Sequence, residues 1–309
     1  MEDFFMYPMI DLHCDTIYSL DANEIQGNII QNDGNVDLRW MEKAGNVTTC
    51  FALFVELGSV VSPFQTALRL YHRFETELHD AKDRIKHVRT ASEIQETTHS
   101  KAILSIEELQ ILEGDLDRIA LLADWGVRLA TLTWNYENDL GFPHHLIGGL
   151  KPFGFEAIGE MEAHNILVDV SHLNDQGFYD VAKVAKKPFI ASHSNCRAIT
   201  NQSRNLSDRM IKTLADHGGV VGLNFCPSFL SEDWNANHIE DMVRHVVHLK
   251  RVGGRDVLAI GTDFDGVSGD LDIKHYDGIE RLRRALEQNG FTTKDLEAMW
   301  YDNALRVLS

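Results

Sequence analysis

Cysteine is scarce in this sequence of 309 residues. The four cysteines are Cys14, Cys50, Cys196 and Cys226. They are widely spaced and form no C-x-x-C pair, which argues against a zinc ribbon and predicts a reduced, cytoplasmic setting.

No apolar run approaches the about 18–20 residues that a membrane-spanning helix needs, so we expect no membrane partner. Residues 1–8 contain acids and no basic segment, and residues 304–309 are short and mixed, so we expect neither a signal peptide nor an anchor signal.

Positive charge is also in short supply. The sequence has 29 Lys and Arg against 47 Asp and Glu, a formal net charge of −18. Without a basic cluster, this balance argues against a nucleic acid or an anionic membrane as partner. We also find no low-complexity linker and no short repeat. With 44% hydrophobic and 25% charged residues, the composition is that of a globular protein, and the simplest organisation is a single domain over residues 1–309.

Two short apolar runs, residues 166–170 and 188–191, are each followed by the dipeptide Ser-His, which contains His172 in the first case and His193 in the second. Residues 174–187 between them have the pattern of a helix. This arrangement predicts a β-α-β unit with one histidine at the carboxyl end of each parallel strand. In parallel α/β folds the chemistry is found at these strand ends.

The same alternation of strands and helices runs through the whole chain. The expected strands are residues 9–15, 47–56, 102–107, 128–133, 166–170, 188–191, 220–224 and 257–263. The expected helices are residues 35–45, 63–84, 115–125, 153–164, 174–187, 207–217, 238–252, 277–288 and 293–307. Eight such units, in a chain slightly longer than the usual ~250 residues, predict a (β/α)₈ TIM barrel of the α/β class. An open doubly wound sheet is the alternative.

Other strand ends also carry residues that bind metals. His13 and Asp15 close the first expected strand, and because strand side chains alternate, positions two apart face the same way. Asp11 has the same parity one step deeper and is better explained as a structural acid. Glu107 ends the strand at 102–107, and Asp263 ends the last one. Each has an ordinary explanation of its own: a core histidine with an ion-pair acid, a helix N-terminal acid, or a turn aspartate.

Together, these side chains favour a site for two cations. Nitrogen and carboxylate ligands without thiolates suit Zn²⁺, with Mn²⁺ or Fe²⁺ as alternatives. Two such ions lie about 3.5–4 Å apart and ionise a bridging water near neutral pH. That hydroxide is the expected nucleophile, and Asp263 is the expected general acid and base. The expected metal ligands are His13 and Asp15 for one ion, His172 and His193 for the other, and Glu107 as the bridge.

Eight segments resemble the membrane (renal-type) dipeptidase family, zinc dipeptidases of the amidohydrolase superfamily. They are IDLHCDT (10–16), AILSIE (102–107), LTWNYEN (132–138), DVSHL (169–173), IASHSN (190–195), SRNLSD (203–208), GVVGLNF (219–225) and GTDFDG (261–266). The likeness spans nearly the whole chain in the right order. DVSH, SHSN, RNLSD and DFDG are its most specific part.

The resemblance implies a dipeptidase with an amidohydrolase-type barrel and two Zn²⁺ per chain, bound by the ligands named above. It implies that Asp263 carries the proton and that Arg204 binds the free carboxylate of the substrate. Without the resemblance, Arg204 would be interpreted as a solvated loop arginine, although its fork of donors suits a carboxylate. Tolerance of a D-residue at the second position of the dipeptide and a homodimer are further expectations from the family.

The sequence also departs from the family. Many members have a histidine on the loop after the strand at 128–133, where this chain has Trp134, which we therefore expect in the substrate-binding site. Tryptophan offers one N–H and no acid or base, and losing such a donor can cost about 10²–10³ in rate. His144 or His145 on the same loop could replace it, or could lie on a mobile surface. Glu108 and Leu109 replace glycines that often follow the bridging glutamate.

Two other functions fit parts of this pattern. Another metal hydrolase of the superfamily, such as a lactonase, amidase or phosphotriesterase, commonly bridges its metals with a carboxylated lysine at the end of the fourth strand. Residues 128–133 contain no lysine, while Glu107 is available on the preceding strand, which favours the dipeptidase. A catalytically silent metal-binding barrel is the other alternative, and Trp134 is its best support.

Overall fold

The computed structural model describes residues 8–96, 98–232, 234 and 236–309. The predicted absence of a signal peptide concerns residues 1–8, of which 1–7 lie outside the described residues. Within the described part of the chain, no helix combines the length and apolar character needed to cross a bilayer.

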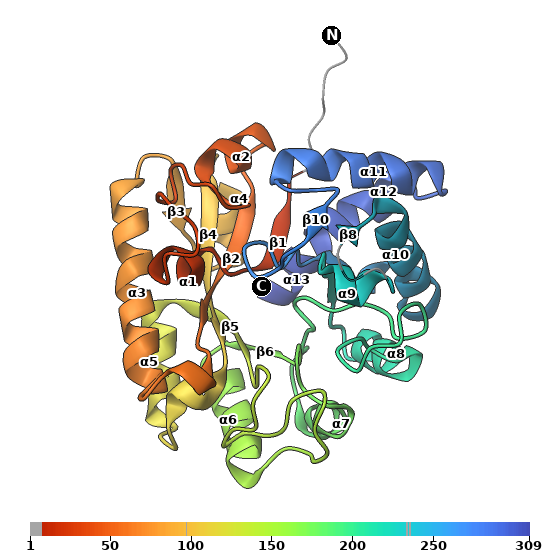
Figure 1. The fold of residues 1–309 in the computed structure, drawn as a ribbon. Coiled ribbons are helices and arrows are strands. Elements are labelled where there is room, and N and C mark those ends of the chain that lie inside the picture. Colours follow the sequence, from red (N-terminus) through yellow and green to blue (C-terminus); the bar gives the residue numbers. More distant parts are fainter. Residues whose placement is uncertain (1–7, 97, 233, 235) are drawn as a thin grey trace.

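Parallel strands form a curled central sheet that helices surround (Figure 1). Seven strands pair side by side in the order β6-β5-β4-β2-β1-β9-β7. Their bounds are β1 Ile10–Cys14, β2 Thr48–Phe54, β4 Ser100–Glu107, β5 Val127–Thr131, β6 Leu167–Asp169, β7 Val221–Leu223 and β9 Leu258–Ile260. Each pairing along this path is parallel, as crossover helices require.

The gap between β6 and β7 is closed by the expected strand at 188–191, although only single bridges form there. Ile190 pairs with Asp169 on one side, and Ala191 pairs with Val221 on the other. Glycines allow this segment to lie close to its neighbours, because a Cβ on Gly222 or Gly261 would lie 1.8 Å from the backbone oxygen of Ser192. The ring therefore closes with seven strands and this segment, which confirms the (β/α)₈ barrel and excludes the open sheet.

The helices begin and end at the residues that cap them. In α3, Pro63 occupies the first turn and Ser62 accepts a hydrogen bond from the backbone N–H of Gln65. In α5, Gly126 ends the helix at φ 91°. The helices are α1 Thr16–Asp21, α2 Leu38–Lys43, α3 Pro63–Asp80, α4 Ala91–Glu96, α5 Asp117–Trp125, α6 Pro152–Ala163, α7 Asp175–Val184, α8 Asp208–Asp216, α9 Pro227–Leu230, α10 Ile239–Gly253, α11 Ile279–Gln288, α12 Thr293–Glu297 and α13 Asn303–Leu308.

Some short elements differ from the prediction. The helix expected at 63–84 ends earlier, and β3 (Ile85–His87) follows it and pairs with β4. The helix expected at 293–307 contains a π-helical turn, Ala298–Asp302, between α12 and α13. Two further strands, β8 (Ala236–Asn237) and β10 (Asp270–Leu271), form a separate small parallel sheet. Such elements are too short to show a hydrophobic period.

The first strand contains a β-bulge that simple alternation does not predict. The register between β1 and β2 shifts between Asp11 and Cys14. Leu12 lies in the same buried hydrophobic cluster as Ile10. The side chain of the next residue, His13, nevertheless approaches Glu107 at the end of β4. Bulges re-aim side chains in this way. Asp11 accepts hydrogen bonds from Thr262 and Tyr276, which supports its structural role.

Candidate metal centre

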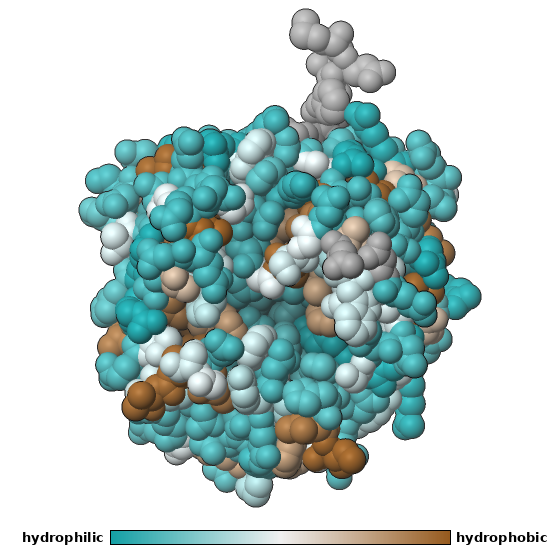
Figure 2. All heavy atoms as spheres, viewed as in Figure 1, coloured by the Kyte–Doolittle hydropathy of each residue, from teal (hydrophilic) through white to brown (hydrophobic). Residues whose placement is uncertain are grey.

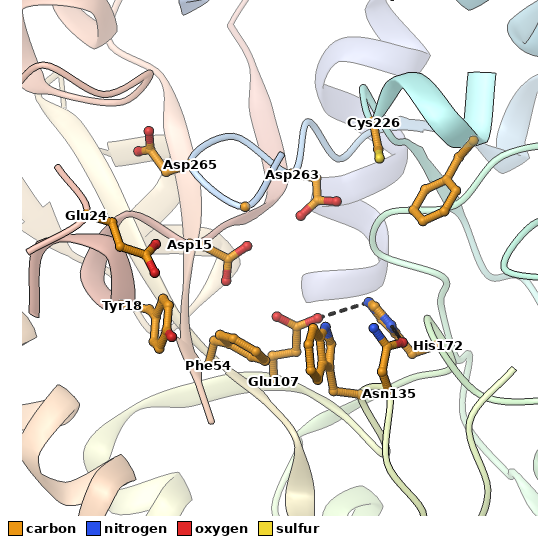
Figure 3. Close-up of a pocket in the computed structure, with 13 residues that line it drawn as sticks. Asp15, Tyr18, Glu24, Phe54, Glu107, Asn135, His172, Cys226, Asp263 and Asp265 are labelled. Atoms are coloured by element: carbon orange, nitrogen blue, oxygen red, sulfur yellow. Dashed lines mark hydrogen bonds and ion pairs between the residues drawn. The ribbon is translucent and has the colours of Figure 1, made fainter. Parts of the chain in front are cut away.

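The Glu107 carboxylate, at the end of β4, lies between histidines from three other strand ends, of which Figure 3 shows His172. Its Oε2 is 3.4 Å from Nε2 of His13. Its Oε1 is 3.1 Å from Nε2 of His172 and 3.6 Å from Nε2 of His193. Oε2 therefore faces His13, and Oε1 faces His172 and His193. A ligand that bridges two metal ions needs this arrangement, with one oxygen for each ion.

On one side, His172 and His193 have fixed ring orientations. Nδ1 of His172 lies 3.0 Å from Oδ1 of Asn135, an acceptor, so this nitrogen carries the proton. Nδ1 of His193 lies 2.7 Å from Oγ of Ser192, whose hydroxyl donates to Oδ2 of Asp169. Both Nε2 atoms therefore expose a lone pair, and they are only 3.1 Å apart. Hydrogen-bond partners of this kind are typical of metal-binding histidines, and a cation between the lone pairs would relieve their repulsion.

Burial keeps these two histidines neutral. Burial, together with the Arg204 guanidinium, lowers the pKa of His172 to about 3. Burial also holds the pKa of His193 well below its usual value. A neutral imidazole is the form that binds a metal, so this pair is ready to act as a ligand at neutral pH.

On the other side, three carboxylates converge on one histidine. Nε2 of His13 lies 3.3 Å from Asp15, 3.4 Å from Glu107 and 3.8 Å from Asp263. Neither ring nitrogen of His13 has a hydrogen-bond partner among the described residues, although the side chain is buried. Burial and the adjacent Glu107 raise the pKa of Asp15 to about 8 and that of Asp263 to about 6. A divalent cation would match this donor set and balance its negative charge.

Two of these residues have a backbone conformation that is uncommon for residues other than glycine. His172 has φ 67° and Asp263 has φ 62°. Such conformations cost about 1–3 kcal/mol and are concentrated at functional sites. The Asp263 side chain is held by Asn224, whose Nδ2 donates to Oδ2 at 2.8 Å.

Arg204 is buried rather than solvated. Only 3% of the residue is exposed, and its guanidinium donates to Oγ of Ser194 and to the backbone oxygen of His193, both at 2.8 Å. The guanidinium also lies 5.6 Å from the ring centre of Phe229. Its Nε–H is also buried and has no partner among the described residues.

A cavity of about 240 Å³ opens at the centre of the face shown in Figure 2. One wall is apolar: Phe54 makes edge contacts with Tyr18 and with Trp134, each with 4.8 Å between ring centres. The lining residues are Asp15, Tyr18, Glu24, Phe54, Glu107, Trp134, Asn135, His172, Cys226, Phe229, Asp263, Asp265 and Gly266. The cavity is thus acidic at its floor and aromatic at one side.

The two loop histidines differ in position. His144 donates its backbone N–H to the backbone oxygen of His172 at 2.6 Å, and its ring Nδ1 lies 2.8 Å from Oγ of Ser203. The ring centres of His144 and His172 are 6.4 Å apart. His145 is exposed beside it. His144 therefore lies near the candidate metal ligands, whereas Trp134 forms part of the cavity wall itself.

Sequence reasoning assigned no role to several residues that support the site. Asn135 orients His172, Ser192 and Asp169 orient His193, and Asn224 holds Asp263. Asn135 and Asn224 both occur in the segments that carry the family resemblance, at 132–138 and 219–225. Their place in these segments was the only indication in the sequence that they support the site, because an asparagine on its own predicts no particular contact.

Comparison with known proteins identifies a family of metallopeptidases, which agrees with the candidate metal centre described above. A sequence model described as membrane dipeptidase (peptidase family M19) matches residues 5–309. An uncharacterized dipeptidase of Schizosaccharomyces pombe is 30% identical over 218 residues, which are 66% of this chain and only about half (51%) of the yeast protein.

Two solved structures are similar over almost their whole length. A metallopeptidase described as dipeptidase AC of family M19 has a TM-score of 0.90 at 27% identity, covering 98% of both chains. A metallopeptidase from Rhodobacter sphaeroides, liganded with a phosphinate mimic of the dipeptide L-Ala-D-Ala, has a TM-score of 0.90 at 26% identity, covering 98% of this chain and 99% of that one. The chain therefore belongs to the membrane dipeptidase family M19, whose members are metal-dependent dipeptidases.

Proposed function

We propose that this protein is a binuclear zinc dipeptidase that cleaves dipeptides and accepts a D-residue at the second position. The observation that carries the proposal is the position of Glu107, whose Oε2 lies 3.4 Å from His13 and whose Oε1 lies 3.1 Å from His172 and 3.6 Å from His193. The D-residue is suggested by the relative from Rhodobacter sphaeroides, which binds a mimic of L-Ala-D-Ala.

In this proposal, His13 and Asp15 hold one Zn²⁺, His172 and His193 hold the other, and Glu107 is shared. When bound, such ions ionise water near neutral pH and polarise the peptide carbonyl. The protein supplies the fixed ring orientations and the buried carboxylates described above.

Asp263 is the proposed general acid and base. It is buried at the cavity, Asn224 fixes one of its oxygens, and burial raises its pKa to about 6. A pKa near the working pH suits a group that must both take and give a proton. Asp263 would accept a proton from the attacking water and donate it to the amine that leaves.

Arg204 is the proposed binding partner of the substrate's terminal carboxylate. Its two terminal nitrogens are oriented by Ser194 and by the His193 backbone, and its buried Nε–H has no partner among the described residues. A carboxylate bound there, beside Phe229, would restrict the substrate to two residues because the peptide bond must also reach the metal centre.

Turnover of a dipeptide panel, with metal content measured in the same samples, tests the proposal. We expect two Zn²⁺ per chain, cleavage of L-Ala-D-Ala, and loss of cleavage after chelation that added Zn²⁺ restores. A dipeptide amide, which lacks the terminal carboxylate, serves as the matched control and should be cleaved at least ~10²-fold less efficiently, since a buried charged pair is lost. A protein with two Zn²⁺ that cleaves no dipeptide, but does cleave a lactone or a phosphotriester, would contradict the proposal.

Other predictions from the sequence stay predictions. These are the homodimer, the cytoplasmic location, the single domain over residues 1–309, and the absence of nucleic-acid and membrane partners. Charge and cysteine content support the location and the absent partners, and the family resemblance supports the homodimer.

A further inference from the structure

Glu108, which directly follows the bridging Glu107, has an unusual conformation. It is fully buried, and its φ is 91°, a value at which residues other than glycine are strained. Strain of this kind persists only where the surroundings hold the residue in place. The contacts of its side chain show what holds it.

The Glu108 carboxylate accepts three hydrogen bonds. Oε1 accepts from the backbone N–H of Gln110 at 2.9 Å and from Nδ2 of Asn138 at 2.5 Å. Oε2 accepts from the backbone N–H of Trp134 at 2.9 Å. Two of the three donors lie on the loop between β5 and α6, so the carboxylate ties this loop to the end of β4.

Asn138 is itself fixed at both ends of its amide. Its Nδ2 also donates to the backbone oxygen of Leu132, and its Oδ1 accepts from the backbone N–H groups of Leu140 and Gly141. Turning the amide over would break these bonds. Glu108 therefore contacts a rigid part of the loop through Asn138 and a second point on it through Trp134.

That second point belongs to the apolar wall of the cavity. The Trp134 ring packs edge-on against Phe54, and Phe54 packs against Tyr18. In Figure 3, Phe54 and Tyr18 lie on the Glu107 side of the cavity, away from Cys226. Because Glu108 binds the backbone of Trp134, its carboxylate fixes the point from which this ring extends.

The wall lies where the first residue of a dipeptide would lie. If Arg204, which lies beside Phe229, binds the terminal carboxylate, the second residue occupies that side of the cavity. The first residue then extends toward Tyr18 and Phe54. Glu24 lines the same side (Figure 3), and its carboxylate matches the ammonium group at the start of a dipeptide.

We propose that Glu108 is a positioning residue that fixes Trp134, and that the wall so formed is an apolar subsite for the side chain of the first residue. The inference rests on the proposed dipeptidase function. It identifies the substrates as dipeptides with a large apolar first residue, such as Leu or Phe.

Two substitutions separate the contacts of Glu108. In Glu108→Gln, one acceptor oxygen becomes an NH₂ group. Because Asn138 cannot turn over, the remaining oxygen should stay with Gln110 and Asn138, and the bond to Trp134 should be lost. In Glu108→Gly, the backbone strain is relieved but all three bonds are lost. Glu156→Gln, at an exposed position on α6, is the matched control.

Amide hydrogen exchange reports on the loop independently of activity. We expect the Trp134 amide to exchange at least ~10-fold faster in Glu108→Gln, as the loss of one buried hydrogen bond predicts. The amides of Leu140 and Gly141 should stay as slow as in the wild type, whereas Glu108→Gly should accelerate all three. An unchanged Trp134 amide in Glu108→Gln would overturn the proposal.

Substrate preference tests the subsite. The metal-loaded wild type should cleave Leu-Ala at least ~10-fold more efficiently than Gly-Ala, by kcat/KM, since filling an apolar pocket gives this order of discrimination. Trp134→Ala should remove most of this preference, and Glu108→Gln should reduce it about threefold or more, with metal content unchanged. A preference that is absent in the wild type, or unaltered in Glu108→Gln, would overturn the proposal. A wild type with full metal that cleaves no dipeptide would instead overturn the proposed function, while the exchange rates would still decide whether Glu108 holds the loop.

Discussion

The two halves of the candidate metal centre are built from different chemistry. The histidine half, His172 and His193, consists of neutral bases whose Nδ1 protons are fixed by Asn135 and Ser192. The carboxylate half consists of His13 and Asp15, with Asp263 beside them, and the ring nitrogens of His13 have no hydrogen-bond partners among the described residues.

This difference shows two ways to prepare a cation site. The histidine half is ready without a metal, because its pKa values are low and its rings are oriented. The carboxylate half gathers negative charge in a buried place, and it becomes favourable only when a proton or a cation compensates that charge. Glu107 belongs to both halves, so a substitution of this residue is the strongest test of whether the two halves form one centre.

The largest effect is expected from Glu107→Gln. The amide nitrogen cannot bind a metal, so one half loses its shared ligand. We expect kcat/KM to fall by roughly 10³-fold or more, because metal-ion catalysis supplies several kcal/mol. Elemental analysis should show fewer than two metals per chain. Glu156→Gln is again the control, and wild-type activity with full metal in Glu107→Gln would show that the two halves are not bridged.

Asp263→Asn should have the next largest effect and should separate catalysis from metal binding. We expect kcat to fall about 10²–10⁴-fold, the usual contribution of a general acid or base, while metal content stays at the wild-type level. The wild-type pH profile should contain a limb that reports the ionisation of Asp263, and this limb should disappear in the variant. Loss of one metal in Asp263→Asn would mean that Asp263 is a ligand of the carboxylate half, since it lies within reach of His13 and Asp15.

The sequence predicted the residues of both halves better than the geometry that brings them together. His172 and His193 were visible because the same dipeptide follows two apolar runs, and the barrel places both runs side by side. His13 was also predicted, but from strand alternation, which the bulge between Asp11 and Cys14 interrupts. A bulge depends on how two distant strands pair, and such pairing leaves no pattern within one strand.

The supporting contacts could not be predicted in the same way. Asn135 and Asn224 hold side chains of the site that come from other parts of the chain, and an asparagine in a loop has many equally good local uses. Likewise, Glu108 could be seen to replace a glycine, but only the structure shows that its carboxylate binds the backbone of Trp134. Side-chain hydrogen bonds between loops are set by tertiary structure, so local sequence patterns do not encode them.

A smaller effect, confined to the histidine half, is expected from Asn135→Ala. Without its acceptor, the His172 ring can turn or change tautomer, and loss of such a partner usually costs about 10–100-fold in metal affinity. Ser192→Ala should act in the same way on His193. Titration against a chelator of known affinity measures the change for each metal, and Asn201→Ala, at an exposed position, is the control. Equal weakening of both metals would indicate a general loss of structure rather than a local one.

The smallest effect, and the most direct measure of the difference between the halves, is proton release on metal binding. Burial and Glu107 raise the pKa of Asp15 to about 8, and despite its burial the pKa of His13 is held well above its usual value by the adjacent carboxylates. At pH 7 the metal-free carboxylate half therefore carries at least one proton, which a cation must displace. The pKa of His172 is lowered to about 3, so the histidine half has no proton to lose.

The affinity of the carboxylate half should accordingly fall as the pH drops below about 8, by up to about tenfold per pH unit for each proton displaced, while that of the histidine half stays constant down to about pH 5. Calorimetric titrations between about pH 6 and 8.5, in buffers of different ionisation enthalpy, count the protons released by each metal. Asp15→Asn removes the titrating carboxylate. It should flatten the pH dependence of metal binding to the carboxylate half without altering metal binding to the histidine half. If both metals release the same number of protons, the two halves are prepared alike, and the contrast between a neutral and a charged half is wrong.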